Sequence, residues 1–473
     1  MDLSKLSIKE AREKLKSGEI TSLDLTKAVL KNIEEKNGKI NAYLEVYEDV
    51  LEQAKIADER IKNGEDLPLL GIPIGVKDNI LIKGRVASSA SKILKNYKAT
   101  YDSTVIKKLK DAGAIFIGRT NMDEFAMGGS TENSAYGPTR NPYDDNRVAG
   151  GSSGGSAGAL AMDGAIATLG TDTGGSVRQP ASLCGVVGLK PTYGSISRFG
   201  LMAMGSSLDQ AGPITRTVSD SELLFNLMAG EDVLDSTTIK TNKRVKKEKK
   251  DIVIGVPWHF LKEGLDESVS KNLKESIKKL EDLGFKTKEI ELPNIKYSLA
   301  VYYIIMPAES STNLARYDGM RYGERVSGEN LLEDYLKSRG EGFGKEVRRR
   351  ILLGTYVLSA GYYDAYYNKA QLVRGLLKED FAKAFKDVDV ILTPTSPIPA
   401  FKVGEKADDP LSMYLADIFT VTANLVGIPA ISVPSGFSEV DGKKLPIGMQ
   451  FMANYLDEDT LFSLGKTFLG EYV

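Results

Sequence analysis

Short apolar runs alternate along this chain with segments whose apolar residues recur at helical spacing, and this alternation constrains the fold more than any other feature. Strand signals that alternate with helix signals are typical of an α/β fold with a largely parallel sheet. Residues 103–113 have the helical repeat. The predicted buried strands span residues 71–77, 114–118, 165–173, 251–256, 286–292, 388–393 and 430–434. We therefore predict an α/β protein.

The N-terminal segment differs from this pattern. Ser7 and Glu10 have the spacing of a capping box, and a second amphipathic stretch begins at Thr21. These signals predict helices over residues 7–62. We describe the segment as an N-terminal helical part of about 1–65.

The charges of the chain are nearly balanced, with 62 Lys and Arg residues against 64 Asp and Glu residues and a net charge of −2. A free-standing nucleic-acid binder usually has a strong basic excess, so this balance argues against that class. The basic stretch at about 240–250 is predicted to be a solvated surface loop, with a nucleic-acid contact as the weaker interpretation. The strands on its two sides could join one sheet or form two domains, and we expect one domain over residues 1–473.

Two scarce residue types exclude several kinds of site. Cys184 is the one cysteine, so an intrachain disulfide and a cysteine-rich metal site are excluded, and we expect it to be buried. His259 is the one histidine, and we predict a loop residue without a catalytic role. We therefore expect no metal site and a general base other than histidine. The N-terminal residues lack the apolar run of a secretory signal, and no run of about 18 apolar residues could span a bilayer, so we predict a cytoplasmic protein without a membrane partner.

Glycine and serine are densest between residues 149 and 176. A flexible linker is excluded because core-like apolar runs flank and interrupt this block. A phosphate-binding loop of the Walker type is also excluded, since the Gly-Lys-Ser/Thr ending that it requires is absent. The remaining interpretation is a turn whose backbone N–H groups converge on a developing oxyanion. In the segment 173–176, the hydroxyl of Ser176 would attack while neighbouring amides stabilise the tetrahedral oxygen.

A serine nucleophile needs a general base, and lysine is the natural candidate in a chain with one histidine. The reference pKa of lysine, about 10.4, is too high for that role unless burial among apolar groups lowers it. Lys77 directly follows the apolar run 72–76, so it suits this requirement. A lysine at a strand end is more often a surface charge, and the residue pattern alone leaves both interpretations open.

The glycine-serine block and its surroundings resemble the amidase signature family. The resemblance is carried by the segments 150–156 and 170–176 with Arg178-Gln179-Pro180 after them, and it extends over essentially the whole chain. Lys77, in Gly75-Val76-Lys77-Asp78, lies where the family has its catalytic lysine. The resemblance implies an α/β fold with a central twisted mixed β-sheet that is covered by helices on both faces.

The resemblance also implies a Ser-Ser-Lys catalytic triad. Neutral Lys77 would take a proton through the bridging hydroxyl of Ser152, and Ser176 would attack an amide carbon to form an acyl-enzyme. Ammonia would leave, and water would then hydrolyse the ester. The oxyanion hole would be formed by the backbone N–H groups of Thr173, Gly174, Gly175 and Ser176.

Further segments are similar to the members of this family that use glutamine as an ammonia source for tRNA-dependent amidation. These segments span residues 121–130, 188–194, 207–213 and 361–367. By resemblance, Arg350 would bind the α-carboxylate of glutamine and Asp417 its α-ammonium group. Tyr302 would add a contact, with Tyr303 as an equally good alignment. The remaining glutamine-binding residues would be Gly128, Gly129 and Ser130.

Such members act in a heterotrimer, so the resemblance implies two partner subunits, B and C. ATP and Mg²⁺ would be used by the complex through the first of these partners, with no cofactor in this chain, and Glu-tRNA(Gln) would be bound mainly by that partner. A stand-alone amidase for small amides remains an alternative, which would share the triad but not the pair Arg350 and Asp417. A glycine-loop nucleotide-binding protein and an inactive structural subunit are two others; the missing Walker lysine and the intact triad count against them.

Overall fold

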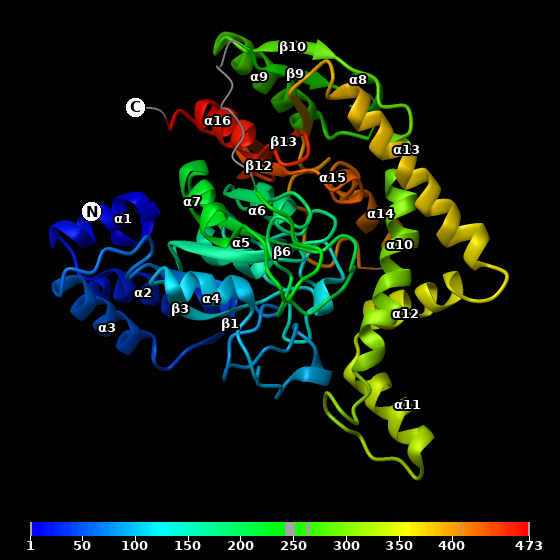
Figure 1. Ribbon diagram of the computed structural model, residues 1–473, viewed down its shortest axis with the longest axis horizontal. Coiled ribbons are helices and arrows are strands. Elements are labelled where there is room, and N and C mark those ends of the chain that lie inside the picture. The colour runs from blue at the N-terminus through cyan, green and yellow to red at the C-terminus, as the bar shows by residue number, and fades with distance from the viewer. Residues whose placement is uncertain (1, 242–250, 262–263, 408, 472–473) are drawn as a thin grey trace.

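The computed structural model describes residues 2–241, 251–261, 264–407 and 409–471, and it contains one large β-sheet surrounded by helices (Figure 1). The sheet has eleven strands in the order β1-β3-β2-β6-β8-β7-β12-β13-β11-β9-β10, and β4 and β5 form a small second sheet. The strands are β1 (Tyr43–Val46), β2 (Pro73–Lys77), β3 (Ile115–Thr120), β4 (Arg140–Asn141), β5 (Asp144–Val148), β6 (Ala167–Asp172), β7 (Val187–Lys190), β8 (Gln210–Thr215), β9 (Val253–Val256), β10 (Lys286–Glu289), β11 (Val390–Pro394), β12 (Ala430–Val440) and β13 (Lys443–Ala453). The helices are α1 (Ile8–Ser17), α2 (Ser22–Ile40), α3 (Val50–Lys62), α4 (Thr104–Asp111), α5 (Gly154–Ala161), α6 (Arg178–Leu183), α7 (Val218–Met228), α8 (Trp258–Leu261), α9 (Glu267–Asp282), α10 (Ser298–Asn313), α11 (Leu331–Gly342), α12 (Lys345–Val357), α13 (Lys369–Ala384), α14 (Pro410–Leu415), α15 (Val421–Val426) and α16 (Glu458–Leu469).

Parallel and antiparallel pairs are combined in the large sheet. This confirms the mixed sheet implied by the family resemblance and corrects the largely parallel sheet expected from the alternation. In this sheet, parallel pairing joins β2 to β3 and β6, and β9 to β10 and β11, while the other pairs are antiparallel. One cause is the hairpin β12–β13, whose turn residues Asp441 and Gly442 both have positive φ, 51° and 72°. Asp-Gly favours such a two-residue turn, which reverses the chain directly and leaves no room for a crossover helix.

The strand predictions all overlap observed strands, and the N-terminal prediction needs one correction. Both predicted helix starts are confirmed, since Ser7 and Thr21 form capping boxes at α1 and α2. Residues 7–62 are not helical throughout, however, because Asn41 takes a left-handed conformation with φ 55° and ends α2. The chain then forms β1, which pairs antiparallel with β3.

The strands on the two sides of the basic loop join one sheet, because β9 pairs with β11 and β11 pairs with β13. Of the predicted loop at about 240–250, residues 242–250 lie outside the described residues.

Helices cover both faces of the sheet, and neighbouring residues of one strand show this directly. In β8, Ile214 packs with Ala157 of α5 and Ala181 of α6 in one hydrophobic cluster. Ala211 of the same strand belongs to the largest cluster, which also contains residues of α1, α2, α4, α7 and α16. Side chains of a strand alternate between the faces, so α5 and α6 lie on one face and the N-terminal helices lie on the other.

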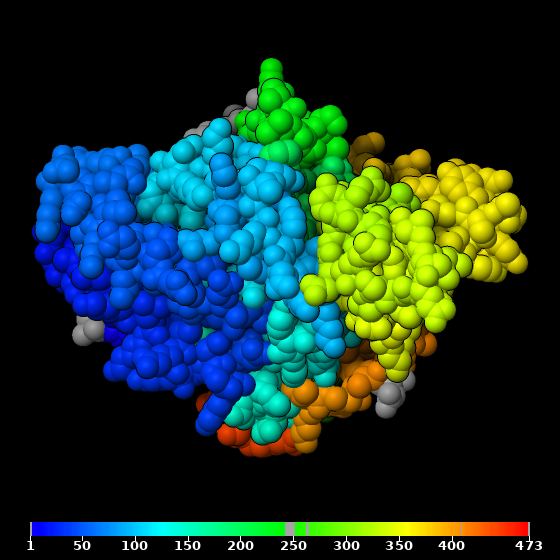
Figure 2. All heavy atoms as spheres, turned by 90° about the horizontal axis from the view of Figure 1, so that it is seen from below, coloured from blue at the N-terminus to red at the C-terminus, as the bar shows by residue number. Residues whose placement is uncertain are grey.

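A set of helices from the second half of the chain forms one side of the molecule. The helix α10 packs against α12 and α13, and α13 packs against α15. Figure 2 shows the N-terminal helices at one end of the molecule and residues of about 320–380 at the other. The sheet and these helices are therefore the two bodies between which a site can be formed.

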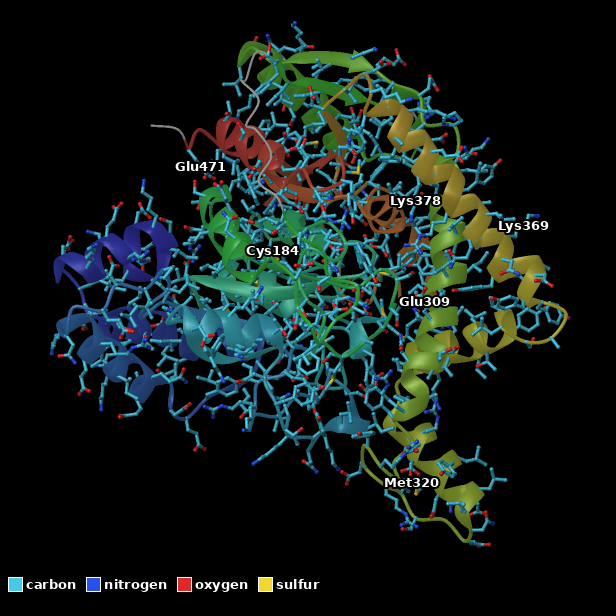
Figure 3. All side chains as sticks on the ribbon, in the orientation of Figure 1. Cys184, Glu309, Met320, Lys369, Lys378 and Glu471 are labelled. Carbon is cyan, nitrogen blue, oxygen red and sulfur yellow. The ribbon has the colours of Figure 1, made fainter. Side chains whose placement is uncertain are left out.

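The two scarce residues have structural roles. Cys184 is fully buried in the interior, as predicted (Figure 3). His259 lies in the one-turn helix α8 and not in a loop, with its Nε2 3.2 Å from the carbonyl oxygen of Leu292. None of the helices among the described residues is both long enough and apolar enough to cross a membrane.

Candidate active site

Lys77 is the last residue of β2, and its side chain is completely buried. Its Nζ lies 2.9 Å from Ser152 Oγ and 2.8 Å from Ser153 Oγ. It also donates to Thr171 of β6, at 2.9 Å to the hydroxyl and 3.3 Å to the carbonyl oxygen. Because β2 and β6 are parallel neighbours, Lys77 and Thr171 approach one another where both strands end. The fold thereby brings Lys77 into direct contact with Ser152, which lies 75 residues further along the chain.

Burial sets the protonation of this lysine. It lowers the pKa of Lys77 from 10.5 to about 7, although the carboxylates of Asp123, Asp172 and Asp209 oppose the shift. The hydrogen-bond partners found for Nζ in the described part of the chain are three hydroxyl groups and one carbonyl oxygen. Uncharged oxygens do not hold an ammonium group as firmly as a carboxylate would. A neutral amine is therefore accessible near neutral pH, as a general base requires.

A buried ion pair shapes the turn that carries Ser176. Arg178 donates to Asp172 through Nε at 3.0 Å and through Nη2 at 2.9 Å, and both side chains are fully buried. Asp172 also accepts hydrogen bonds from the backbone N–H groups of Gly175 at 2.8 Å and Val177 at 3.2 Å. Burial favours the neutral acid, but Arg178 outweighs it and holds the pKa of Asp172 well below its usual range. The carboxylate thus fixes the turn between β6 and α6.

The same turn leaves some backbone donors open and closes one. The N–H of Gly175 is used by Asp172, so it is not free to stabilise an oxyanion. Within the described residues, the N–H groups of Thr173, Gly174 and Ser176 have no protein acceptor. Three of the four expected oxyanion donors are therefore open.

Ser176 lies beside the other two triad residues. The backbone N–H of Ser153 donates to the carbonyl oxygen of Ser176 at 3.1 Å, which places the segments 152–153 and 176 next to each other. The Ser176 side chain is nearly buried, with 7% of its surface exposed. Among the described residues, its hydroxyl does not hydrogen-bond to Ser152. The contact between Lys77 and Ser152 is thus formed, and the one between Ser152 and Ser176 is not.

The loop containing Gly128, Gly129 and Ser130 borders the segment that leads into Ser152. Gln179 joins the two, because its Nε2 donates to the carbonyl oxygen of Gly129 at 2.9 Å and its Oε1 accepts from the N–H of Gly151 at 3.0 Å. A Cβ on Gly151 would lie 2.7 Å from the backbone nitrogen of Ser130. Only glycine permits this close approach.

Tyr302 and Asp417 both lie beside the catalytic turn. A Cβ on Gly174 would lie only 2.5 Å from Cζ of Tyr302, so the tyrosine ring packs directly on this glycine. Thr420 donates to the carbonyl oxygen of Gly174 at 2.6 Å and to that of Asp417 at 3.1 Å. A Cβ on Gly129 would lie 3.8 Å from Oδ1 of Asp417. The expected glutamine-binding residues from three separate segments therefore meet at one place.

Tyr303 joins the proposed ammonium site to the proposed carboxylate site. Its hydroxyl donates to Oδ2 of Asp417 at 3.1 Å, and the guanidinium carbon of Arg350 lies 5.6 Å from the centre of its ring. Arg350 is buried, and it lines a cavity together with Gly128, Ser130, Met413 and Tyr414. Burial raises the pKa of Asp417 to about 7, although the hydrogen bond from Tyr303 opposes the shift. Both tyrosines of the ambiguous alignment are thus at the site, Tyr302 against the turn and Tyr303 between the charges.

Several residues of this site were not predicted. Asp172 and Arg178 lie inside or directly after the glycine-serine block, where acid and base six positions apart flank the turn. Gln179 follows Arg178 in the same motif, and the sequence assigns it no role. Ser153 and Thr171 have no distinctive sequence signal, because only the fold brings them to Lys77.

Comparisons with known proteins agree on one family. The family model described as Amidase matches residues 24–462. The A subunit of the glutamyl-tRNA(Gln) amidotransferase of Thermoanaerobacter pseudethanolicus is 53% identical, over 99% of this chain and 96% of that protein. The corresponding A subunit of Thermodesulfovibrio yellowstonii is also 53% identical, over 99% and 97% of the two chains.

Solved structures give the same result. The crystal structure of the glutamyl-tRNA(Gln) amidotransferase A subunit from Thermotoga maritima has a TM-score of 0.79 and 42% identity, covering 99% of this chain and 95% of that one. The peptide amidase from Stenotrophomonas maltophilia has a TM-score of 0.83 and 28% identity, covering 98% and 96%.

The lowered pKa of Lys77 predicts how the reactivity of Ser176 depends on pH. We expect the rate at which a small sulfonyl fluoride labels Ser176 to rise with pH and to have its midpoint at about 7, because only neutral Lys77 accepts a proton. Lys77→Met should lower the rate at least about 100-fold. Mass spectrometry of the labelled protein measures this. Lys271→Met, on the exposed face of α9, is the control, and a pH-independent rate would contradict the role of Lys77.

The ion pair predicts a large loss of stability when one partner is removed. Asp172→Asn should lower the free energy of unfolding by about 3–5 kcal/mol, because it leaves the charge of Arg178 buried and unpaired. Urea denaturation at neutral pH measures the difference, with Asp282→Asn on exposed α9 as the control. Since the pKa of Asp172 is held low, its stabilisation is present above the ordinary aspartate pKa of about 4 and decreases below it, so the two proteins should converge in acid. Equal stability at neutral pH would show that the pair does not hold the turn.

Proposed function

This chain belongs to the amidase signature family, and on that basis we propose that it is the glutamine-hydrolysing A subunit of a glutamyl-tRNA(Gln) amidotransferase. One observation carries the proposal. The buried Lys77, hydrogen-bonded to Ser152, lies in a site that also contains a cation, Arg350, and an anion, Asp417. Free glutamine has one α-carboxylate and one α-ammonium group, so its recognition needs this combination of charges.

The proposed reaction uses the triad in sequence. Neutral Lys77 accepts the proton of Ser152, and Ser152 accepts that of Ser176. The Ser176 oxygen then bonds to the amide carbon of glutamine, while the open N–H groups of the turn stabilise the oxyanion. The carbon–nitrogen bond breaks, the proton passes to the leaving nitrogen, and ammonia is released. Water then hydrolyses the ester and releases glutamate.

The proposed binding mode follows from the charges. Arg350 pairs with the α-carboxylate, and Asp417 with the α-ammonium group. Tyr302 packs on Gly174 and is placed to contact the side chain of the substrate next to Ser176. The segment 128–130 would close the site on the side of Ser152.

The relatives are named as subunits, which supports a complex as the working form. We propose that this chain assembles with subunits B and C and transfers its ammonia to Glu-tRNA(Gln), which is bound mainly by the first of these partners. ATP and Mg²⁺ would act on that partner and not in this chain. Copurification from the native host with tRNA present would test the assembly.

A stand-alone amidase acting on small amides is the second candidate, because the peptide amidase shares the fold at 28% identity. The two candidates differ in their response to partners. Glutamine hydrolysis that increases when subunits B and C are added supports the proposed function. Ready hydrolysis of unrelated amides, without any response to the partners, would support the stand-alone amidase.

The role of Ser176 predicts a separation of two activities. In the assembled complex, Ser176→Ala should reduce glutamine-dependent formation of Gln-tRNA(Gln) by more than about 1,000-fold, because no acyl-enzyme forms. Ammonium chloride should still support that formation at a near-normal rate, since ammonia then needs no release. Lys77→Ala should be as severe, because members of one catalytic unit are not additive.

The measurement separates Glu-tRNA from Gln-tRNA after a timed reaction. Ser270→Ala on α9 is the control and should resemble the unmodified protein. Near-normal glutamine-dependent activity of Ser176→Ala would reject the assignment of the nucleophile.

A further inference from the structure

Glu346 is buried in the first turn of α12, one helical turn before Arg350. Its Oε1 accepts hydrogen bonds from Nε of Arg350 at 2.7 Å and from the hydroxyl of Tyr414 at 3.0 Å. Its Oε2 accepts a hydrogen bond from Arg349. A carboxylate with three donors on two oxygens has little freedom to move, so Glu346 holds the groups around it in a fixed arrangement.

The contacts of Arg350 leave one edge of its guanidinium group open. Nε is occupied by Glu346, and Nη1 lies 3.7 Å from Sδ of Met306. Within the described residues, Nη2 has no acceptor, and Arg350 lines the cavity described above. The edge formed by Nη1 and Nη2 is therefore the one that can receive a carboxylate with two parallel hydrogen bonds.

A stacked pair of tyrosines connects Glu346 to the ammonium side of the site. The rings of Tyr303 and Tyr414 lie 3.9 Å apart with an interplanar angle of 22°. Tyr414 is bonded to Glu346, and Tyr303 donates to Asp417. The guanidinium carbon of Arg350 lies 5.6 Å from the centres of both rings. One continuous network thus runs from the cation to the anion.

We propose that Glu346, acting through Arg350 and the Tyr414–Tyr303 stack, is a positioning residue that makes the site specific for amides of α-amino acids. It turns one guanidinium edge toward the substrate and fixes the separation between Arg350 and Asp417. Substrates that carry both an α-carboxylate and an α-ammonium group match that separation, and simple amides lack one or both charges. The inference rests on the proposed function, because it concerns the same glutamine site.

Three primary amides separate this role from a general structural one. Glutamine carries both charged groups, 4-carbamoylbutanoate keeps only the carboxylate, and 4-aminobutanamide keeps only the ammonium group. In the assembled complex, Glu346→Gln should raise KM about tenfold for glutamine and for 4-carbamoylbutanoate, because the orientation of Arg350 is lost. The KM for 4-aminobutanamide and the kcat for all three should stay unchanged.

Two further variants test the path through the tyrosines. Tyr414→Phe keeps the ring stack but removes the hydrogen bond to Glu346, so it should raise KM for the same two substrates by a smaller factor. Tyr303→Phe removes the hydrogen bond to Asp417, so it should affect glutamine and 4-aminobutanamide instead. If the network is continuous, Glu346→Gln combined with Tyr303→Phe should raise KM for glutamine by a factor different from the product of the two single effects.

Two controls establish that the protein remains intact. Glu275→Gln changes an exposed glutamate of α9 and should leave every constant unchanged. Amidation supported by ammonium chloride should be the same in all variants, since it does not use this site.

The outcomes separate the inference from the proposed function. If Glu346→Gln raises KM equally for all three amides or lowers kcat, Glu346 is only structural and the inference is wrong. If the unmodified complex does not prefer glutamine to both analogues, the proposed function itself fails. If it prefers glutamine and Glu346→Gln keeps that preference, only the inference fails.

Discussion

The buried pair of Asp172 and Arg178 is the interaction on which the rest of the site depends. Asp172 binds the backbone on both sides of Ser176 and thereby sets which N–H groups of the turn are used and which stay open. Arg178 extends the constraint, because its Nη1 donates to the carbonyl oxygen of Thr420 at 3.0 Å. Thr420 is in turn bonded to Gly174 and to Asp417. A charge pair of this kind is weak evidence for overall stability, since both ions lose their hydration. Its value here is geometric, because one network orients the nucleophile, the oxyanion donors and the proposed ammonium site together.

The same interior explains how a lysine serves where other hydrolases use histidine. Three carboxylates are near enough to favour the charged form of Lys77, yet burial outweighs them. Each carboxylate is already engaged elsewhere. Asp172 pairs with Arg178, Asp209 accepts from Thr173 Oγ1 at 2.7 Å, and Asp123 accepts from the N–H of Thr131 at 2.9 Å. Burial also raises the pKa of Asp123 to about 6, although hydrogen bonds to the backbone oppose that shift. Because these charges are satisfied by other groups, Lys77 has hydroxyl partners and can give up its proton near neutral pH.

Sequence reasoning located the chemistry better than the geometry. Lys77 and Ser152 were identified because the motif and the scarcity of histidine leave few candidates, and their contact needs only that β2 and β6 be neighbours. The engagement of the Gly175 N–H was not predictable, since it depends on where a side chain three residues earlier points. The hairpin β12–β13 had a readable signal, Asp441-Gly442, that the strand prediction at 430–434 did not use. The strand β1 had none, because four residues after a helix become a strand only through their pairing with β3. The choice between Tyr302 and Tyr303 could not be made from an alignment, because both residues serve the site in different ways.

The site also separates catalysis from recognition along the chain. Lys77, Ser152, the turn and Asp172 come from the sheet and from α5 and α6, whose cores pack on both faces of the strands. Arg350, Tyr303, Tyr414 and Asp417 come from α10, α12 and α14 with the residues after it, which meet the turn mainly through Tyr302 and Thr420. Changes in the second group alter the charges that meet a substrate without moving the strands that hold the first. A peptide amidase with the same fold and 28% identity is consistent with this division, because the sheet can be kept while the recognition side diverges. Substrate choice in such a protein is therefore decided by how rigidly the helices present their charges to a turn that the sheet has already fixed.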